Sequence, residues 1–107
     1  MKTKHVHLTA RDVQMGTHAD RRCPLTFALN RTLAPMHRAE VYWRGDEGRY
    51  RVVRYPIAGQ ATGDMVHDAA LPAEFAEFLR QYDDEHVAAK GFRPIEAAIE
   101  LPDEVAL

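Results

Sequence analysis

The sequence has few of the features that mark secreted, membrane or catalytic proteins. It holds one cysteine, so no disulfide can form within the chain, as is usual in a reducing cytoplasm. No apolar run approaches the roughly 20 residues of a membrane span, and residues 1–9 lack the apolar core of a signal peptide. A glycine-rich phosphate loop, a nucleophile elbow and a closed zinc signature are also missing. We therefore expect a cytoplasmic protein that does not associate with a membrane.

The composition is that of an ordinary globular domain. The 107 residues, 46% hydrophobic and 28% charged, predict one domain over residues 1–107. The net charge of −2 is unevenly divided. Residues 1–55 hold 11 basic and 5 acidic side chains, net +6, and residues 56–107 hold 3 and 11, net −8. Segregated halves would steer oppositely charged partners, whereas interleaved halves would cancel in surface ion pairs.

Residues 23–33 form the most apolar segment and carry the clearest helix start. Pro24 suits the first helical position, which places Cys23 at the N-cap. Leucines recur with helical period and predict a buried stripe; they are Leu25, Leu29 and Leu33. Phe27 and Arg31 lie on the other face, so Phe27 either meets a second layer of the protein or is offered to a partner. The Ala-Pro pair that follows ends the helix.

A second helix and four strands complete the expected fold. Pro72 opens the helix, whose apolar positions again follow the helical period; they are Phe75, Phe78, Leu79 and Tyr82. Strand patterns cover residues 5–9, 40–44, 49–55 and 94–101. Thr9 caps a short helical turn over residues 10–15, and the long connection 56–70 holds a short strand near Met65.

The resulting order, β-α-β-β-α-β, predicts an α+β domain. We expect a small antiparallel or mixed sheet with two helices on one face. Ferredoxin-like connections are one arrangement of these elements. Pairing of the last strand beside the first is another. The tail after Pro102 is expected to fray.

The hairpin of residues 40–55 carries the main candidate binding surface. Alternation predicts an inner, buried face, formed by Val41, Trp43, Tyr50 and Val52. It predicts an outer, basic and aromatic face, formed by Glu40, Tyr42, Arg44, Arg49, Arg51 and Val53. Arginine and tyrosine suit protein interfaces, and they also suit stacking on nucleic-acid bases. The predicted partner-binding residues are Tyr42, Arg44, Arg49, Arg51 and Arg54 of the hairpin, with Phe27 and Arg31 of the first helix.

Scattered histidines and the lone cysteine are the basis of an alternative hypothesis, a metal site or a reactive thiol. His5 and His7 share one face of a strand, and His18 could supply a further metal ligand or activate Cys23. A helix N-terminus after two arginines lowers a thiol pKa, although a lone cysteine before an apolar helix is more often a buried hydrophobe. Because the spacing matches no known ligand set, we expect no metal, no cofactor and no catalytic residue.

The first third of the chain carries a series of short motifs. They are Val6-His7-Leu8-Thr9, Asp12-Val13, Gly16, and Cys23-Pro24-Leu25 running through Ala28-Leu29. This pattern resembles the start of small uncharacterised proteins encoded by bacteriophages and prophages. The resemblance implies an accessory protein in a bacterial cytoplasm, where such proteins often act by binding and blocking host or defence machinery. It implies no activity and no catalytic residues.

Together these features predict a non-enzymatic binding module with a bacterial protein partner, acting as an inhibitor of a host or defence complex. A nucleic-acid binder that uses the basic hairpin is the first alternative. A small metal-dependent or thiol enzyme built from His5, His7, His18 and Cys23 is the second. The sequence also leaves a homo-oligomer open.

Overall fold

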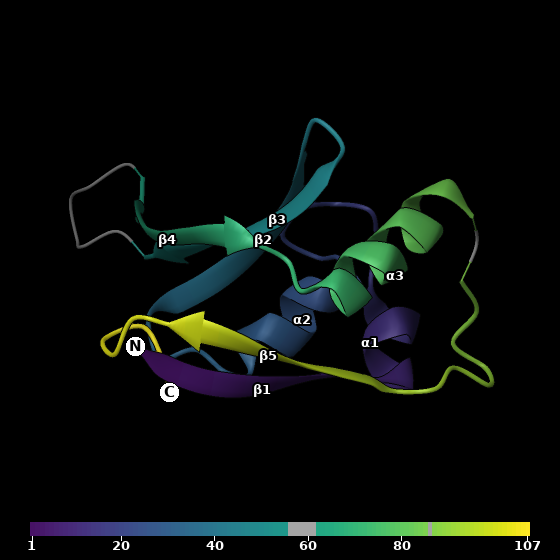
Figure 1. Cartoon of the computed structure of the whole chain (residues 1–107), viewed down its shortest axis with the longest axis horizontal. Helices are drawn as coiled ribbons and strands as arrows, with labels where there is room; N and C mark the ends of the chain where they lie inside the picture. Colours follow the sequence, from purple (N-terminus) through teal and green to yellow (C-terminus); the bar gives the residue numbers. More distant parts are fainter. Residues whose placement is uncertain (56–61, 86) are drawn as a thin grey trace.

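The structure is a computed structural model that describes residues 1–55, 62–85 and 87–107 (Figure 1). In chain order its elements are β1 (Lys2–Leu8), α1 (Ala10–Met15), α2 (Pro24–Asn30), β2 (His37–Arg44), β3 (Glu47–Arg54), β4 (Asp64–Ala70), α3 (Ala73–Asp84) and β5 (Ile95–Leu101). The predicted α+β class is confirmed, and the arrangement is compatible with a ferredoxin-like fold. The structure adds α1 as a complete helix and β4 as a full strand. Part of the predicted 56–70 connection, residues 56–61, lies outside the described residues.

The strands form two antiparallel sheets. One has the order β2-β3-β4, and the other pairs β1 with β5, as expected for the last strand beside the first. Helix α2 packs against β2 and β1, and α3 packs against β3 and β5. The helices therefore join the two sheets around one core, with α2 between them (Figure 1). No helix in the described ranges is long and apolar enough to cross a membrane.

Local sequence explains where the first helices begin. Thr9 closes a capping box, because its hydroxyl accepts from the Asp12 N–H at 3.3 Å while its own N–H donates to the Asp12 carboxylate at 3.0 Å. Cys23 is the N-cap of α2, with Pro24 at the first position. Helix α2 ends at Asn30, earlier than the apolar stripe indicates. The N–H groups of Thr32 and Leu33 bond to carbonyl groups three residues back, and the chain then turns toward the C-terminal segment.

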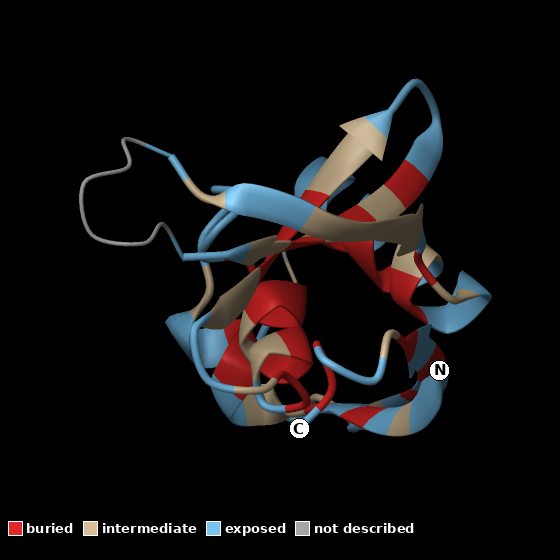
Figure 2. Cartoon of the chain, turned by 90° about the vertical axis from the view of Figure 1, so that its left-hand side faces the viewer, coloured by how far each residue is buried: buried red, intermediate tan, exposed pale blue. Residues whose placement is uncertain are grey.

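The predicted apolar stripes are buried. Leu25, Leu29 and Leu33 of the first stripe are at most 6% exposed, and all four apolar residues of α3 are buried as well. Figure 2 shows the buried positions gathered between the sheets and along the helices. The prediction of a frayed tail is wrong. Val105 is fully buried, and Ala106 forms a β-bridge with Leu33, so the C-terminal residues close one end of the core.

The β2–β3 hairpin turns through two residues, Gly45 and Asp46, with Gly45 at a φ of 63° that favours glycine. Three predicted inner residues, Val41, Tyr50 and Val52, are buried. Trp43 is half-buried and packs against the core. One prediction needs correction, because Glu40 of the outer face is only 6% exposed.

Candidate partner-binding face

The candidate site is the outer face of the three-stranded sheet, on the side away from α2 and α3 (Figure 1). The register places on it Arg38, Glu40, Tyr42 and Arg44 of β2, Glu47, Arg49, Arg51 and Val53 of β3, and Met65, Asp68 and Ala70 of β4. Four predicted partner-binding residues therefore lie together: Tyr42, Arg44, Arg49 and Arg51. Arg54 alternates onto the opposite side of β3 and pairs with Asp64 at 3.2 Å.

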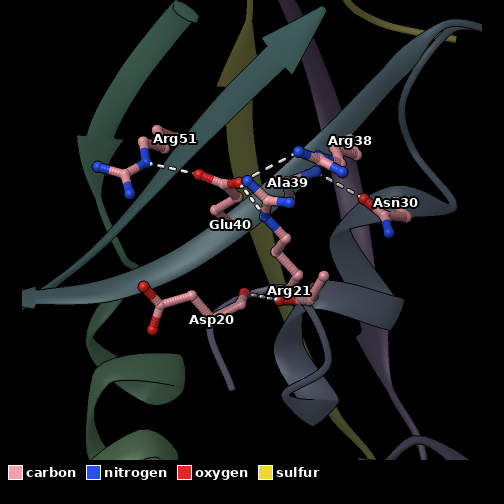
Figure 3. Close-up of polar contacts among 8 residues, drawn as sticks. Asp20, Arg21, Asn30, Arg38, Ala39, Glu40 and Arg51 are labelled. Atoms are coloured by element: carbon pink, nitrogen blue, oxygen red, sulfur yellow. Dashed lines mark hydrogen bonds and ion pairs between the residues drawn. The ribbon is translucent and has the colours of Figure 1, made fainter. Parts of the chain in front are cut away.

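Glu40 is the centre of this face. Its Oε1 accepts a hydrogen bond from Arg51 Nε at 2.8 Å, and its Oε2 accepts one from Arg21 Nε at 2.7 Å. Arg38 Nη2 approaches the same Oε2 at 3.6 Å (Figure 3). Burial raises the pKa of Glu40, but the hydrogen bonds and charges of Arg51 and Arg21 outweigh it, so the pKa lies below its usual value. Three guanidinium groups thus surround one carboxylate.

The segment before α2 positions Arg21 beside Glu40. The Asp20 carbonyl accepts from the Val41 N–H at 3.0 Å and from the Thr26 hydroxyl at 2.8 Å. Asn30 Oδ1 accepts from the Ala39 N–H at 2.7 Å. These bonds tie the segment and α2 to the edge of β2, and they leave the Arg21 side chain reaching over that edge to Glu40 (Figure 3). Sequence pattern alone gives no sign of this contact, because Arg21 lies 19 residues from Glu40.

A second network crosses the face toward β4. The Arg51 guanidinium lies over the Tyr42 ring at 4.6 Å, and the Tyr42 hydroxyl donates to Asp68 Oδ2 at 2.5 Å. Asp68 Oδ1 accepts from Arg49 Nε at 3.0 Å and from Nη2 at 2.8 Å, and Arg49 also pairs with Glu47. Burial raises the pKa of Asp68, but bonds from Tyr42 and Arg49 lower it overall. On this face, an acidic side chain from the second half of the chain therefore pairs with basic side chains from the first half. The excess of positive charge lies near β2.

The two predicted partner-binding residues of the first helix are separated from this face. Arg31 forms a bidentate pair with Asp12, at 2.7 and 2.6 Å, and donates to the His7 carbonyl at 2.7 Å. It is thus committed to holding α1, α2 and β1 together. Phe27 is half-buried beside the exposed Met15, where both line a shallow pocket of about 300 Å³.

The residues of the alternative metal site do not converge. His5 and His7 both approach Glu96, at 3.1 and 3.7 Å, whereas His18 pairs with Asp83 at 3.2 Å in another part of the molecule. Within the residues that the structure describes, no group of three or more histidine, cysteine or carboxylate side chains could hold a metal ion.

Cys23 does not have the environment of an activated thiol. It is 3% exposed, and its Sγ lies 3.6 Å from the Thr26 hydroxyl. Burial raises the pKa of Cys23, as fits the buried hydrophobe favoured from the sequence, and the lowering that two preceding arginines can cause is not seen. The physical reason is that Arg21 is directed to Glu40 and Arg22 is exposed to solvent.

One polar pair was not predicted from the sequence. Tyr50 was expected only as a core residue, yet its hydroxyl lies 3.2 Å from His67 Nε2, in a pocket of about 410 Å³ between β4 and β5. Burial raises the pKa of Tyr50 to about 12 and lowers the pKa of His67. The pair could not be predicted without the β3–β4 pairing, which places His67 opposite Val52.

Comparison with known proteins finds no family model, no curated protein and no solved structure that matches this chain. The functional inference therefore rests on the geometry and charge of the outer face.

Proposed function

We propose that the chain is a non-enzymatic binding module that docks a protein partner on the outer face of the β2-β3-β4 sheet. The observation that carries this proposal is the group of three arginines held around the buried carboxylate of Glu40. Arginine and tyrosine are the residues that most often dominate interface energies. Here the Arg51–Tyr42 stack and the Glu40 bonds fix the arginines before binding, which reduces the entropy lost on association.

The charge of the face favours an acidic partner. With Arg21 it holds five arginines against three carboxylates, which are Glu40, Glu47 and Asp68. Such an excess steers an acidic surface toward the face and disfavours a basic one. In the setting implied by the phage and prophage resemblance, the partner is a bacterial protein. Docking would then block a surface that a host or defence complex needs.

The proposal is tested by affinity capture from bacterial lysate on immobilised protein. The informative variant is Arg38→Glu combined with Arg44→Glu, because Arg49 and Arg51 hold the sheet network and are left intact. Arg80→Glu on α3 is the matched control, since Arg80 lies outside the face and forms an ion pair with Glu77 of the same helix. We expect the same partner on wild type and on the control, and its loss on the double variant with an unchanged circular dichroism spectrum. Equal retention on all three, or no partner on any, would contradict the proposal.

Single-stranded nucleic acid is the second candidate partner. The observation in its favour is that arginine–tyrosine pairs, Arg51 with Tyr42 and Arg38 with Tyr55, are groups that also stack on bases and contact phosphates. The carboxylates among these arginines weigh against it. A gel shift with single-stranded DNA and RNA at rising salt separates the two, because phosphate contact gives a steep loss of affinity with salt.

A further inference from the structure

A pocket of about 350 Å³ opens on the β2 side of the outer face. Arg21 and Arg38 both line it, together with Glu40, Tyr55 and Thr62. Arg51, which holds the other oxygen of Glu40, is not among its described lining residues. The pocket therefore collects two of the three guanidinium groups that surround the buried carboxylate.

Glu40 is hydrogen-bonded to Arg21 and only ion-paired with Arg38. Its Oε1 is used by Arg51, so its Oε2 is shared by Arg21 Nε at 2.7 Å and Arg38 Nη2 at 3.6 Å. A guanidinium has five N–H donors, and 3.6 Å is too long for a good hydrogen bond. Within the described part of the chain, Arg38 Nε is buried without a hydrogen-bond partner. Arg38 is thus held by an ion pair and a ring contact but not by a hydrogen bond to Glu40.

The surroundings hold Arg38 in place and add neutral polar groups. Its guanidinium lies over the Tyr55 ring at 5.5 Å, and its side chain is 28% exposed. Tyr55 and Thr62 are exposed and each carries a hydroxyl. A ligand in this pocket would meet a net positive lining with hydroxyl groups beside it, which is the chemistry of an oxyanion site.

We propose that this pocket binds an oxyanion, a carboxylate or phosphate group, between the guanidinium groups of Arg21 and Arg38. The inference rests on the proposed function, and it names the chemical group by which the acidic partner is anchored. Glu40 is the positioning residue of the site. Its bond to Arg51 holds the carboxylate, and the carboxylate draws the two pocket arginines together.

The test is a titration of the full chain, labelled with ¹⁵N, with inorganic phosphate and separately with acetate. Sodium chloride at matched ionic strength is the reference. We expect saturable shifts confined to the amides of the pocket residues. Arg38→Gln should weaken the binding about tenfold, as for the loss of one charge-assisted hydrogen bond, and Arg21→Gln should act alike. Arg80→Gln, on α3, should leave it unchanged.

Each outcome is decisive. Saturation by acetate, with or without phosphate, supports the pocket and shows that a carboxylate is sufficient, whereas saturation by phosphate alone supports it with a phosphoryl group as the ligand. Shifts no larger than those caused by chloride, or unaltered in Arg38→Gln, overturn it. If Arg38→Gln and Arg21→Gln still capture the partner and no anion binds, the pocket is not an anion site, while the proposed docking face stands.

Discussion

Replacing Glu40 by glutamine removes the negative charge from between three guanidinium groups and leaves the size of the side chain unchanged. Glutamine keeps one oxygen acceptor, but its NH₂ group faces an arginine donor where Oε1 or Oε2 stood. The Glu40 side chain is 7% exposed, whereas Arg21 and Arg51 are 62% and 36% exposed. Water therefore compensates the arginines in part, and the carboxylate hardly at all.

The expected cost follows from two charge-assisted hydrogen bonds. Each is worth about 1.5–3 kcal/mol when well shielded, and solvent around the exposed arginines reduces this to about 1 kcal/mol. The variant should thus lose about 2 kcal/mol of unfolding free energy, and its Tm should fall by about 8 °C for a domain of this size. Urea unfolding followed by the fluorescence of Trp43, the single tryptophan, measures the loss directly.

Glu47→Gln is the matched control, because Glu47 is 50% exposed and pairs only at the edge of the network. It should cost less than about 0.5 kcal/mol. The pH dependence gives a second check. Because folding lowers the pKa of Glu40, its stabilisation is complete above the ordinary glutamate pKa of 4.5 and is lost as pH falls below it. The gap between wild type and Glu40→Gln should therefore close in acid. A variant as stable as the control at neutral pH would refute the reasoning.

Three other perturbations test the remaining contacts. Asp12→Asn breaks the bidentate pair with Arg31 and weakens the α1 capping box, so thermal unfolding at pH 7 should show a loss of about 2–3 kcal/mol that shrinks below pH 4. Burial lowers the pKa of His67, so wild-type stability should fall as pH drops below 6.5. This fall should be absent in His67→Gln when the free energy of unfolding in urea is measured as a function of pH. Cys23, buried and with a raised pKa, should react with a thiol reagent only after urea unfolds the chain; rapid labelling of the folded protein would contradict its placement.

Elements whose signals are local could be predicted from the sequence. The apolar positions of α3 recur within one segment, and its helical period already places Phe75 and Phe78 in the core. The start of α2 at Pro24 and the N-cap at Thr9 likewise depend on neighbours in the chain. The alternation of the hairpin correctly assigned Tyr42 and Arg51 to one face.

Features that depend on distant segments could not be predicted. Alternation placed Glu40 on the outer face, but its burial requires Arg21 to cross the edge of β2, a contact fixed by the backbone bond from Val41 to Asp20. The same applies to Arg31, whose partner Asp12 belongs to another helix. Division of the strands into two sheets also follows from packing around α2, which no single segment of sequence encodes.

The central claim is that the outer face of the β2-β3-β4 sheet docks a protein partner, and site-specific photo-crosslinking tests it most directly. A photoreactive residue replaces Met65, which is exposed on that face, and in a second protein replaces Gln81, which is exposed on α3. After irradiation in bacterial lysate, mass spectrometry should find one covalent partner at position 65, absent at position 81 and lost when Arg38 and Arg44 are changed to glutamate. Equal adducts at both positions, or none at position 65, would contradict the account.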